Sequence, residues 1–154
     1  MLTEICQELH NWFDRGMPRH FGKVSVSGGV LLLDGSAPDL QPGQFYRLVG
    51  TVFNDGVHKW GDASDQLTDE RAVDAALWEM AVPQAVLQLA ADIATWQAKY
   101  GGVGSLNMSP YTSESFGGYS YSKGGGGSGS AGSGGSGTWQ AAFAPRLNRW
   151  RKLR

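Results

Sequence analysis

Apolar residues recur at helical spacing at the start of the chain. Over residues 3–15 the pattern makes one apolar face, formed by Leu2, Ile5, Cys6, Leu9, Trp12 and Phe13. Thr3 is suited to cap the start of a helix, and Gly16 and Pro18 are suited to end it. The pattern therefore predicts a helix over residues 3–15.

Residues 23–60 show the pattern of β structure. The stretch KVSVSGG alternates between valine and serine, VLLL follows as a second short run, and FYRLVGTVF and VHKW come later. Between the last two runs stands the triplet Asn54-Asp55-Gly56, whose residues tolerate positive φ. This region predicts several strands, the last two of them joined as a hairpin.

Two more helices are predicted in the middle of the chain. Over residues 69–81 a buried stripe is formed by Val73, Ala76, Leu77 and Met80, with Thr68 as the N-cap. Pro83 separates this segment from a longer one over residues 83–100. The inward positions of the longer helix are Val86, Leu89, Ala90, Ile93, Trp96 and Tyr100.

These elements predict a small α+β fold of one domain. We expect a helical body, made of the N-terminal helix and the later helix pair, with an inserted β-hairpin region and an extended C-terminal arm. The expected divisions are an α+β core (1–102), an aromatic arm (103–123), a Gly/Ser linker (124–137) and a basic tail (138–154). The linker has nine glycines, four serines and one alanine, a composition typical of flexible coil.

Charge divides the chain into an acidic body and a basic tail. Residues 1–123 carry eight basic and fourteen acidic side chains, whereas residues 124–154 carry five basic and no acidic ones. This asymmetry indicates an interaction tail that meets an acidic protein surface or nucleic acid. Cys6 is the only cysteine, and neither a signal peptide nor a membrane span is evident, so we expect a soluble chain made in a reducing cytoplasm.

The sequence predicts no catalytic, cofactor or metal site. The three histidines lie far apart without ligand-like spacing, and His10 is better explained by a surface ion pair with Asp14. Cys6 lies on an apolar helix face and is better explained as a buried residue than as a nucleophile. The acidic run GDASDQLTDE lacks the ligand order of a calcium loop and is typical of a helix N-terminus.

The arm contains the stretch SPYTSESFGGYSYSK at residues 109–123. Its aromatic residues stand among serine and glycine, a composition typical of adaptable contact surfaces. We expect it to bury these residues on another chain. The predicted contact residues are Tyr111, Glu114, Phe116, Gly117, Gly118, Tyr119 and Tyr121.

The tail is the second predicted contact. If residues after Pro145 are helical, Phe143, Leu147 and Trp150 form one apolar face with cationic residues around it. Three interpretations stay open: a solvated tail, a plug for an acidic groove on a partner, and a contact with phosphate backbone. The predicted anchor residues are Trp139, Phe143, Arg146, Leu147, Arg149, Trp150, Arg151, Lys152 and Arg154.

Three stretches together resemble a known family. In order they are GQFYRLVGTVFNDGVHKW, LTDERAVDAALWEMAVPQAVLQLAADIATWQAKY and SPYTSESFGGYSYSK, and the most specific pieces are FNDGV, WEMAVP and SESFGGYSYSK. They resemble the head–tail connector proteins of tailed bacteriophages, also called neck, adaptor or head-completion proteins. The similarity covers roughly residues 1–123, and the better-known connectors are nearly all helical.

Membership in that family implies a structural role in the virion neck. Connectors form a ring, typically of twelve subunits, beneath the portal protein, extend the DNA channel and receive the next neck or tail protein. C-terminal arms in such rings commonly dock on the portal. The resemblance thus implies portal, neighbouring connector subunits and a downstream neck or tail protein as partners. Beyond these, the basic tail suggests a non-specific contact with packaged DNA.

The sequence features are also compatible with other functions. A minor capsid protein or another neck protein has the same general features, and a DNA-binding module would use the basic tail. An enzyme, such as a small hydrolase, is the least favoured alternative because no nucleophile–base pair is recognisable. No membrane partner is expected.

Overall fold

A computed structural model describes residues 1–100, 113–116, 119–122 and 138–152. The chain divides into two compact units. The helical unit contains residues 3–11 and 84–154, and the β unit contains residues 12–83. Residues 138–152 therefore belong to the same unit as residues 3–11 and 84–100.

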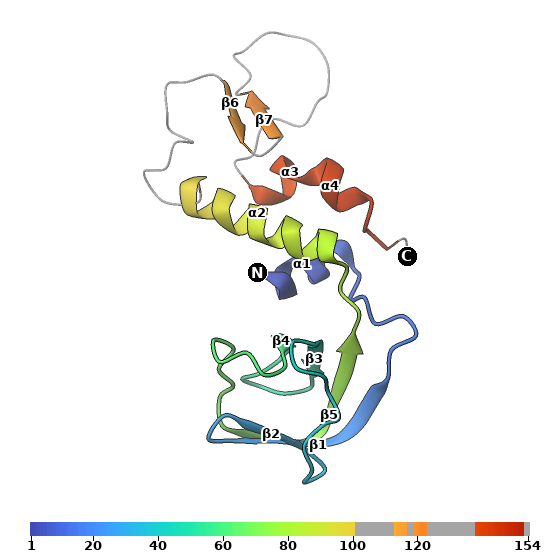
Figure 1. Ribbon diagram of the computed structural model, residues 1–154. Helices are drawn as coiled ribbons and strands as arrows, with labels where there is room; N and C mark the ends of the chain where they lie inside the picture. Colours follow the sequence, from blue (N-terminus) through green and yellow to red (C-terminus); the bar gives the residue numbers. More distant parts are fainter. Residues whose placement is uncertain (101–112, 117–118, 123–137, 153–154) are drawn as a thin grey trace. The chain divides into compact units, whose positions relative to one another are not determined.

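The fold is a small α+β fold, as predicted. The helical unit contains α1 (Leu2–Leu9), α2 (Gln84–Tyr100), α3 (Trp139–Ala142) and α4 (Ala144–Asn148). It also contains the paired strands β6 (Ser113–Phe116) and β7 (Tyr119–Ser122). Within this unit α3 and α4 run beside α2 (Figure 1).

The β unit is built around one curled antiparallel sheet (Figure 1). Its strands are β1 (Arg19–Ser27), β2 (Val30–Leu33), β3 (Phe45–Val49), β4 (Gly56–Lys59) and β5 (Glu70–Met80), in the order β2-β1-β5-β3-β4. The core lies on one face and contains Val24, Val26, Leu31, Leu40, Tyr46, Leu48, Ala75 and Leu77. The hairpin predicted around Asn54-Asp55-Gly56 is confirmed, since β3 and β4 pair antiparallel.

The prediction of a helix over residues 69–81 is wrong. These residues form β5, the central strand, which pairs with β1 on one side and with β3 on the other. Ala75 and Leu77 therefore reach the core by the two-residue period of a strand. Pairing on both sides overrides the helix propensity of an alanine-rich segment.

The first helix is shorter than predicted. It ends at Leu9, because His10 adopts a left-handed backbone conformation with φ of 49°. The amide of Asn11 then donates to the carbonyl of Cys6, which closes the helix in the way a glycine commonly does. The predicted buried face is confirmed for Ile5, Cys6 and Leu9 only. The longer helix is confirmed as α2, with Val86, Leu89, Ile93, Trp96 and Tyr100 buried.

Candidate interaction surfaces

The connection between β3 and β4 is held by a buried asparagine. The Asn54 side chain is 3% exposed. Its Nδ2 donates to the carbonyl of Thr68 at 2.8 Å, and its Oδ1 accepts from the amide of Thr68, also at 2.8 Å. The backbone of Thr68 thus provides hydrogen bonds to both Nδ2 and Oδ1 of Asn54, and this pairing fixes the loop against the start of β5.

Glu70 adds a second clamp to this loop. Its carboxylate accepts hydrogen bonds from the amide of Val52, from the amide of Phe53 at 3.2 Å and from Nδ2 of Asn54 at 2.7 Å. Burial alone would raise the pKa of Glu70, but these hydrogen bonds favour the charged form and hold the pKa below its ordinary value. Glu70 therefore meets the loop as a carboxylate at neutral pH.

The clamped loop presents two large apolar side chains to solvent. Val52 is 80% exposed and Phe53 is 70% exposed, although the amides of both residues are bound. We call Val52 and Phe53 the apolar loop. A rigid backbone that exposes apolar side chains is suited to binding, because little conformational entropy is lost when a partner covers them.

His58 links Asn54, the residue after the apolar loop, to the connection between β4 and β5. Its Nε2 lies 2.9 Å from the carbonyl oxygen of Asn54, and its Nδ1 lies 2.9 Å from Oδ1 of Asp65. Both neighbours are acceptors, so a ring protonated on both nitrogens donates in both directions. The second oxygen of Asp65 accepts from the amide of Lys59 at 2.5 Å.

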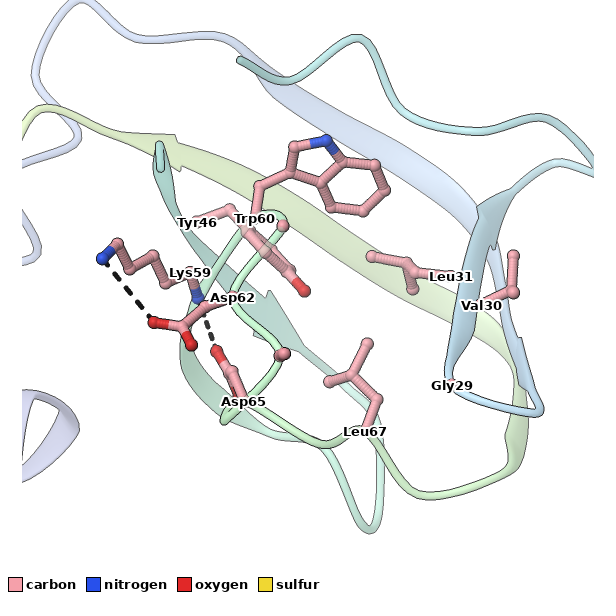
Figure 2. A pocket seen from close by; sticks show the side chains of 11 residues that line it. Gly29, Val30, Leu31, Tyr46, Lys59, Trp60, Asp62, Asp65 and Leu67 are labelled. Carbon is pink, nitrogen blue, oxygen red and sulfur yellow. Dashed lines mark hydrogen bonds and ion pairs between the residues drawn. The ribbon is translucent and has the colours of Figure 1, made fainter. Parts of the chain in front are cut away.

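An apolar hollow of about 460 Å³ opens between edge strand β2 and the β4–β5 connection (Figure 2). Leu31 and Leu67 point into the same space, and the Trp60 ring lies on its other side (Figure 2). Tyr46 is buried and packs edge-on against Trp60, with ring centroids 6.1 Å apart. We call this space the hollow. It is lined by Gly29, Val30, Leu31, Tyr46, Lys59, Trp60, Gly61, Asp62, Ala63, Asp65 and Leu67.

The polar groups of the hollow are mostly bound within the unit. Burial, reinforced by the charge of Asp65, raises the pKa of Tyr46, so the phenol is neutral. Asp62 accepts from the amide and hydroxyl of Ser64, and these hydrogen bonds lower the pKa of its carboxyl group. The Lys59 ammonium lies 3.6 Å from Asp62 and is 43% exposed, so it forms a cationic point on the rim.

The face of the sheet opposite the core carries a stack of arginine and tryptophan. The Arg47 guanidinium lies 3.5 Å from the ring centroid of Trp12 and 5.0 Å from that of Trp78. Arg19 lies 4.3 Å from the Trp78 centroid and pairs with the buried carboxylate of Asp14. Arg19 and Arg47 are brought together because both pair with Trp78 across neighbouring strands.

A second groove, of about 310 Å³, lies on this opposite face. We call it the outer groove. Its exposed apolar side chains are Phe21 and Val73, and Gly50 lies directly after β3, beside Asp74 of β5. A Cβ on Gly50 would lie 2.8 Å from the carbonyl oxygen of Asp74, so only glycine allows this approach. The lining residues are Phe21, Gly22, Val49, Gly50, Val73, Asp74, Ala75, Ala76 and Trp78.

The predicted arm residues fall partly within the described hairpin. In the register of the two strands, Glu114 pairs with Tyr121, and Phe116 pairs with Tyr119. Serines pair with serines at the intervening positions. Tyr111, Gly117 and Gly118 lie outside the described residues. The paired strands differ from the extended arm that was predicted, because the register gives the segment its own backbone partners.

The predicted tail anchor packs within the helical unit. Trp139, Phe143 and Leu147 are buried, and Phe143 meets Trp96 of α2 edge-on with centroids 6.3 Å apart. Arg146 pairs with Asp92 at 2.7 Å. The interpretation as a solvated tail is therefore wrong for these residues, because the apolar face predicted after Pro145 is covered by the chain's own helices.

The end of the tail is tied to the first helix. Arg151 pairs with Glu8 at 2.6 Å, and the Lys152 amide donates to the carbonyl of Leu9 at 2.9 Å. Asn11 donates to the carbonyl of Trp150 at 3.0 Å. Arg149 and Lys152 have exposed side chains, and Arg154 lies outside the described residues. Binding of a partner or of DNA by these cations stays a prediction.

No protein-family model matches the chain, and no curated protein or solved structure matches it at a significant level. In the described part of the chain, no group of three or more His, Cys, Asp and Glu side chains is placed to hold a metal ion. No helix within the described ranges is long and apolar enough to cross a membrane.

Sequence reasoning missed the apolar loop and the hollow. The signal for the loop was present in TVFNDG, where two large apolar residues directly precede a turn triplet. Because β3 ends at Val49, these two residues have no strand face on which to be buried. The hollow had no comparable signal, because its lining comes from β2, β3 and the β4–β5 connection.

Proposed function

We propose that this chain is a structural protein of a bacteriophage virion, a head–tail connector that forms a ring beneath the portal and joins head to tail. The resemblance of three stretches within residues 1–123 to connector proteins names the family. The structural observation that supports an assembly role is the apolar loop, because Val52 and Phe53 are exposed on a backbone fixed by Glu70 and Asn54. Large apolar side chains held in this way are suited to a protein partner.

The hairpin β6–β7 supports the same proposal. Its register pairs Phe116 with Tyr119 and Glu114 with Tyr121. An isolated two-stranded hairpin is at best marginally stable in water, so it needs a second surface to pack against. In the proposed function this surface belongs to the portal or to a neighbouring subunit.

The alternative of a DNA-binding module has less support. Two of the tail cations, Arg146 and Arg151, already pair with Asp92 and Glu8, which reduces the charge available for phosphate. A module of this kind would bind DNA with steep salt dependence and would lose binding when Arg149 and Lys152 are changed to Ala. The connector proposal instead predicts binding to portal protein.

The proposal is tested with portal-containing heads that lack the connector. The wild-type chain should cosediment with these heads, and Phe116→Ala with Tyr119→Ala should stay folded but fail to attach. The matched control is Ser115→Ala with Ser120→Ala, which changes the intervening cross-strand pair of the same hairpin. Attachment of the aromatic variant at the wild-type level would refute the role of the hairpin, and failure of the wild type to attach would refute the connector assignment.

A further inference from the structure

The imidazole of His58 is held between two hydrogen-bond acceptors. Its Nε2 lies 2.9 Å from the carbonyl oxygen of Asn54, and its Nδ1 lies 2.9 Å from Oδ1 of Asp65. The side chain is only 14% exposed, so these contacts form within the unit and not in open solvent. A ring with two protons donates to both acceptors, whereas a neutral ring carries one proton and turns a lone pair toward the other acceptor. The number of hydrogen bonds that His58 makes therefore depends on its protonation.

A neutral His58 ring should keep its proton on Nδ1. Asp65 presents a carboxylate there, and a hydrogen bond to a charged acceptor is stronger than one to a backbone carbonyl. The second oxygen of Asp65 accepts from the amide of Lys59, which fixes the carboxylate beside the ring. The contact that a neutral ring loses is therefore the one from Nε2 to the carbonyl oxygen of Asn54.

The Asn54 carbonyl is the backbone attachment of the segment that directly follows the apolar loop. The Asn54 side chain is held separately, by Thr68 and Glu70. The loop therefore stays attached through that side chain when the carbonyl is released. Loss of the bond to His58 should instead loosen the peptide between Asn54 and Asp55, and with it the turn that leads into β4.

The charged and titratable groups that contact His58 or its neighbours come from β3, β4, β5 and the β4–β5 connection. They are Tyr46 of β3, Lys59 of β4, Glu70 and Glu79 of β5, and Asp62 and Asp65 of the connection. Tyr46 is neutral, because burial raises the pKa of its phenol. Histidine is the side-chain type that ordinarily changes charge between about pH 5 and 8. The histidines of the β unit are His20 and His58, so a response in this range belongs to one of these two rings.

We propose that His58 is a proton-dependent latch on the connection between β3 and β4. With two protons on the ring, the latch is closed and bridges Asn54 to Asp65. With one proton, the ring stays bound to Asp65 and releases the Asn54 carbonyl. A rise in pH through the range in which histidine titrates therefore loosens the end of the apolar loop. The latch is a property of the β unit alone and does not depend on the connector proposal.

The variant Asp65→Asn distinguishes a latch from a purely structural contact. The asparagine oxygen can accept from the Lys59 amide, which directs the NH₂ group toward Nδ1 of His58. A neutral ring then accepts at Nδ1 and donates from Nε2 to the Asn54 carbonyl. We therefore expect the latch to stay closed at high pH in this variant, although the charge of the wild-type carboxylate has been removed.

Two further variants identify the titrating group. His58→Gln replaces the ring with a side chain that forms hydrogen bonds but does not titrate. The matched control is His20→Gln, because His20 is the other histidine of the β unit and also lies beside a carboxylate, 2.9 Å from Oε1 of Glu79. Circular dichroism checks that each variant keeps its fold.

NMR of the full chain between about pH 5.5 and 8 measures the outcome. The ring-nitrogen shifts count the protons on His58, and the carbonyl carbon shift of Asn54 reports the hydrogen bond that it accepts. The protection factor of the Thr68 amide, which donates to Asn54, reports how firmly the loop is held. As the wild-type ring loses a proton, we expect the Asn54 signal to shift with the same midpoint. The Thr68 amide should lose protection roughly three- to tenfold, as for one hydrogen bond. His20→Gln should respond as the wild type does, whereas Asp65→Asn should keep both signals at high pH and His58→Gln should show no transition.

The wild type alone is sufficient to overturn the inference, so a variant that fails to fold does not leave it untested. A His58 ring that keeps the same number of protons across this range refutes the latch, and so does an Asn54 signal that stays constant while the ring loses a proton. Release of Asn54 in Asp65→Asn at high pH, as in the wild type, refutes the role of Asp65. A transition that persists in His58→Gln, or that disappears in His20→Gln, assigns the response to another group.

Discussion

The carboxylate of Glu70 on β5 accepts a hydrogen bond from the backbone amide of Phe53, at 3.2 Å. The bond fixes the backbone of a residue whose ring is exposed to solvent. Two groups of Phe53 thus have different roles. The backbone amide is held within the unit, while the ring is available to a partner. Because its backbone is fixed by hydrogen bonds, this loop differs from a flexible loop that merely contains an exposed apolar residue.

Replacement of Glu70 by glutamine should loosen the apolar loop. Both carboxylate oxygens accept donors, and glutamine would place an NH₂ group against one set of these donors. We expect a loss of about 1 kcal/mol in the free energy of unfolding, as for a hydrogen bond to a partly exposed charged group. Urea unfolding of Glu70→Gln measures this loss.

The matched control for that experiment is Asp39→Asn, at an exposed position in the segment between β2 and β3. It removes one negative charge from the same unit. Equal unfolding free energies for the two variants would show that Glu70 contributes only its charge and does not clamp the loop.

The clamp should also depend on pH. Hydrogen bonds hold the folded-state pKa of Glu70 below its ordinary value of 4.5, despite the opposing effect of burial. A lowered folded pKa means that the stabilisation is present above pH 4.5 and is lost as the pH falls through the folded pKa. The amide resonance of Phe53, followed by NMR during acidification, should shift with a midpoint below 4.5. Glu70→Gln should abolish this transition, and an unchanged transition in the variant would assign it to another group.

The helix α2 and the hairpin β3–β4 could be predicted because their signals are local. Pro83 and the glycines after Tyr100 bound one long apolar stripe, and Asn54-Asp55-Gly56 marks one turn. The amphipathic pattern of the tail is also a local signal, and the helix α4 (Ala144–Asn148) forms where this pattern predicts one. Elements of this kind can be predicted without knowing which residues they pack against.

The errors arose where distant residues decide the structure. Residues 70–80 are compatible with a helical stripe, but β1 and β3 supply partners on both sides and select a strand. The sequence left open whether the tail is solvated, binds a partner or contacts phosphate backbone, because nothing in it shows that Trp96 and Asp92 lie beside the tail. The hollow likewise depends on the curl of a sheet, which places Val30 and Leu67 around one space.

Arg47 should stabilise the β unit through its stack with tryptophan. Its guanidinium lies 3.5 Å from the Trp12 centroid and 5.0 Å from the Trp78 centroid, so it contacts two rings at once. Replacement by methionine keeps the length and apolar character of the side chain but removes the cation. We expect Arg47→Met to lower the free energy of unfolding by about 1–2 kcal/mol, in the range of desolvated cation–π contacts.

The comparison for this variant is Arg71→Met, which changes an exposed arginine on β5. Both substitutions remove one positive charge from the same sheet, so long-range effects are matched. Urea unfolding followed by tryptophan fluorescence compares the two variants. If Arg71→Met destabilises the unit as much as Arg47→Met, the stack contributes nothing specific.

Phe143 should be required for the tail to pack on the helical unit. Its side chain is 2% exposed and meets Trp96 edge-on at 6.3 Å between centroids. Phe143→Ala should lower the free energy of unfolding of this unit by about 3–5 kcal/mol, the usual cost of removing a buried phenylalanine. Urea unfolding followed by circular dichroism measures this loss. Limited proteolysis should show faster cleavage within residues 138–152, because the tail loses its main apolar contact. The matched control is Gln140→Ala on α3, which changes an exposed residue of the same segment. Wild-type stability and protease resistance in Phe143→Ala would mean that the tail is held by its ion pairs, Arg146–Asp92 and Arg151–Glu8, and not by apolar packing.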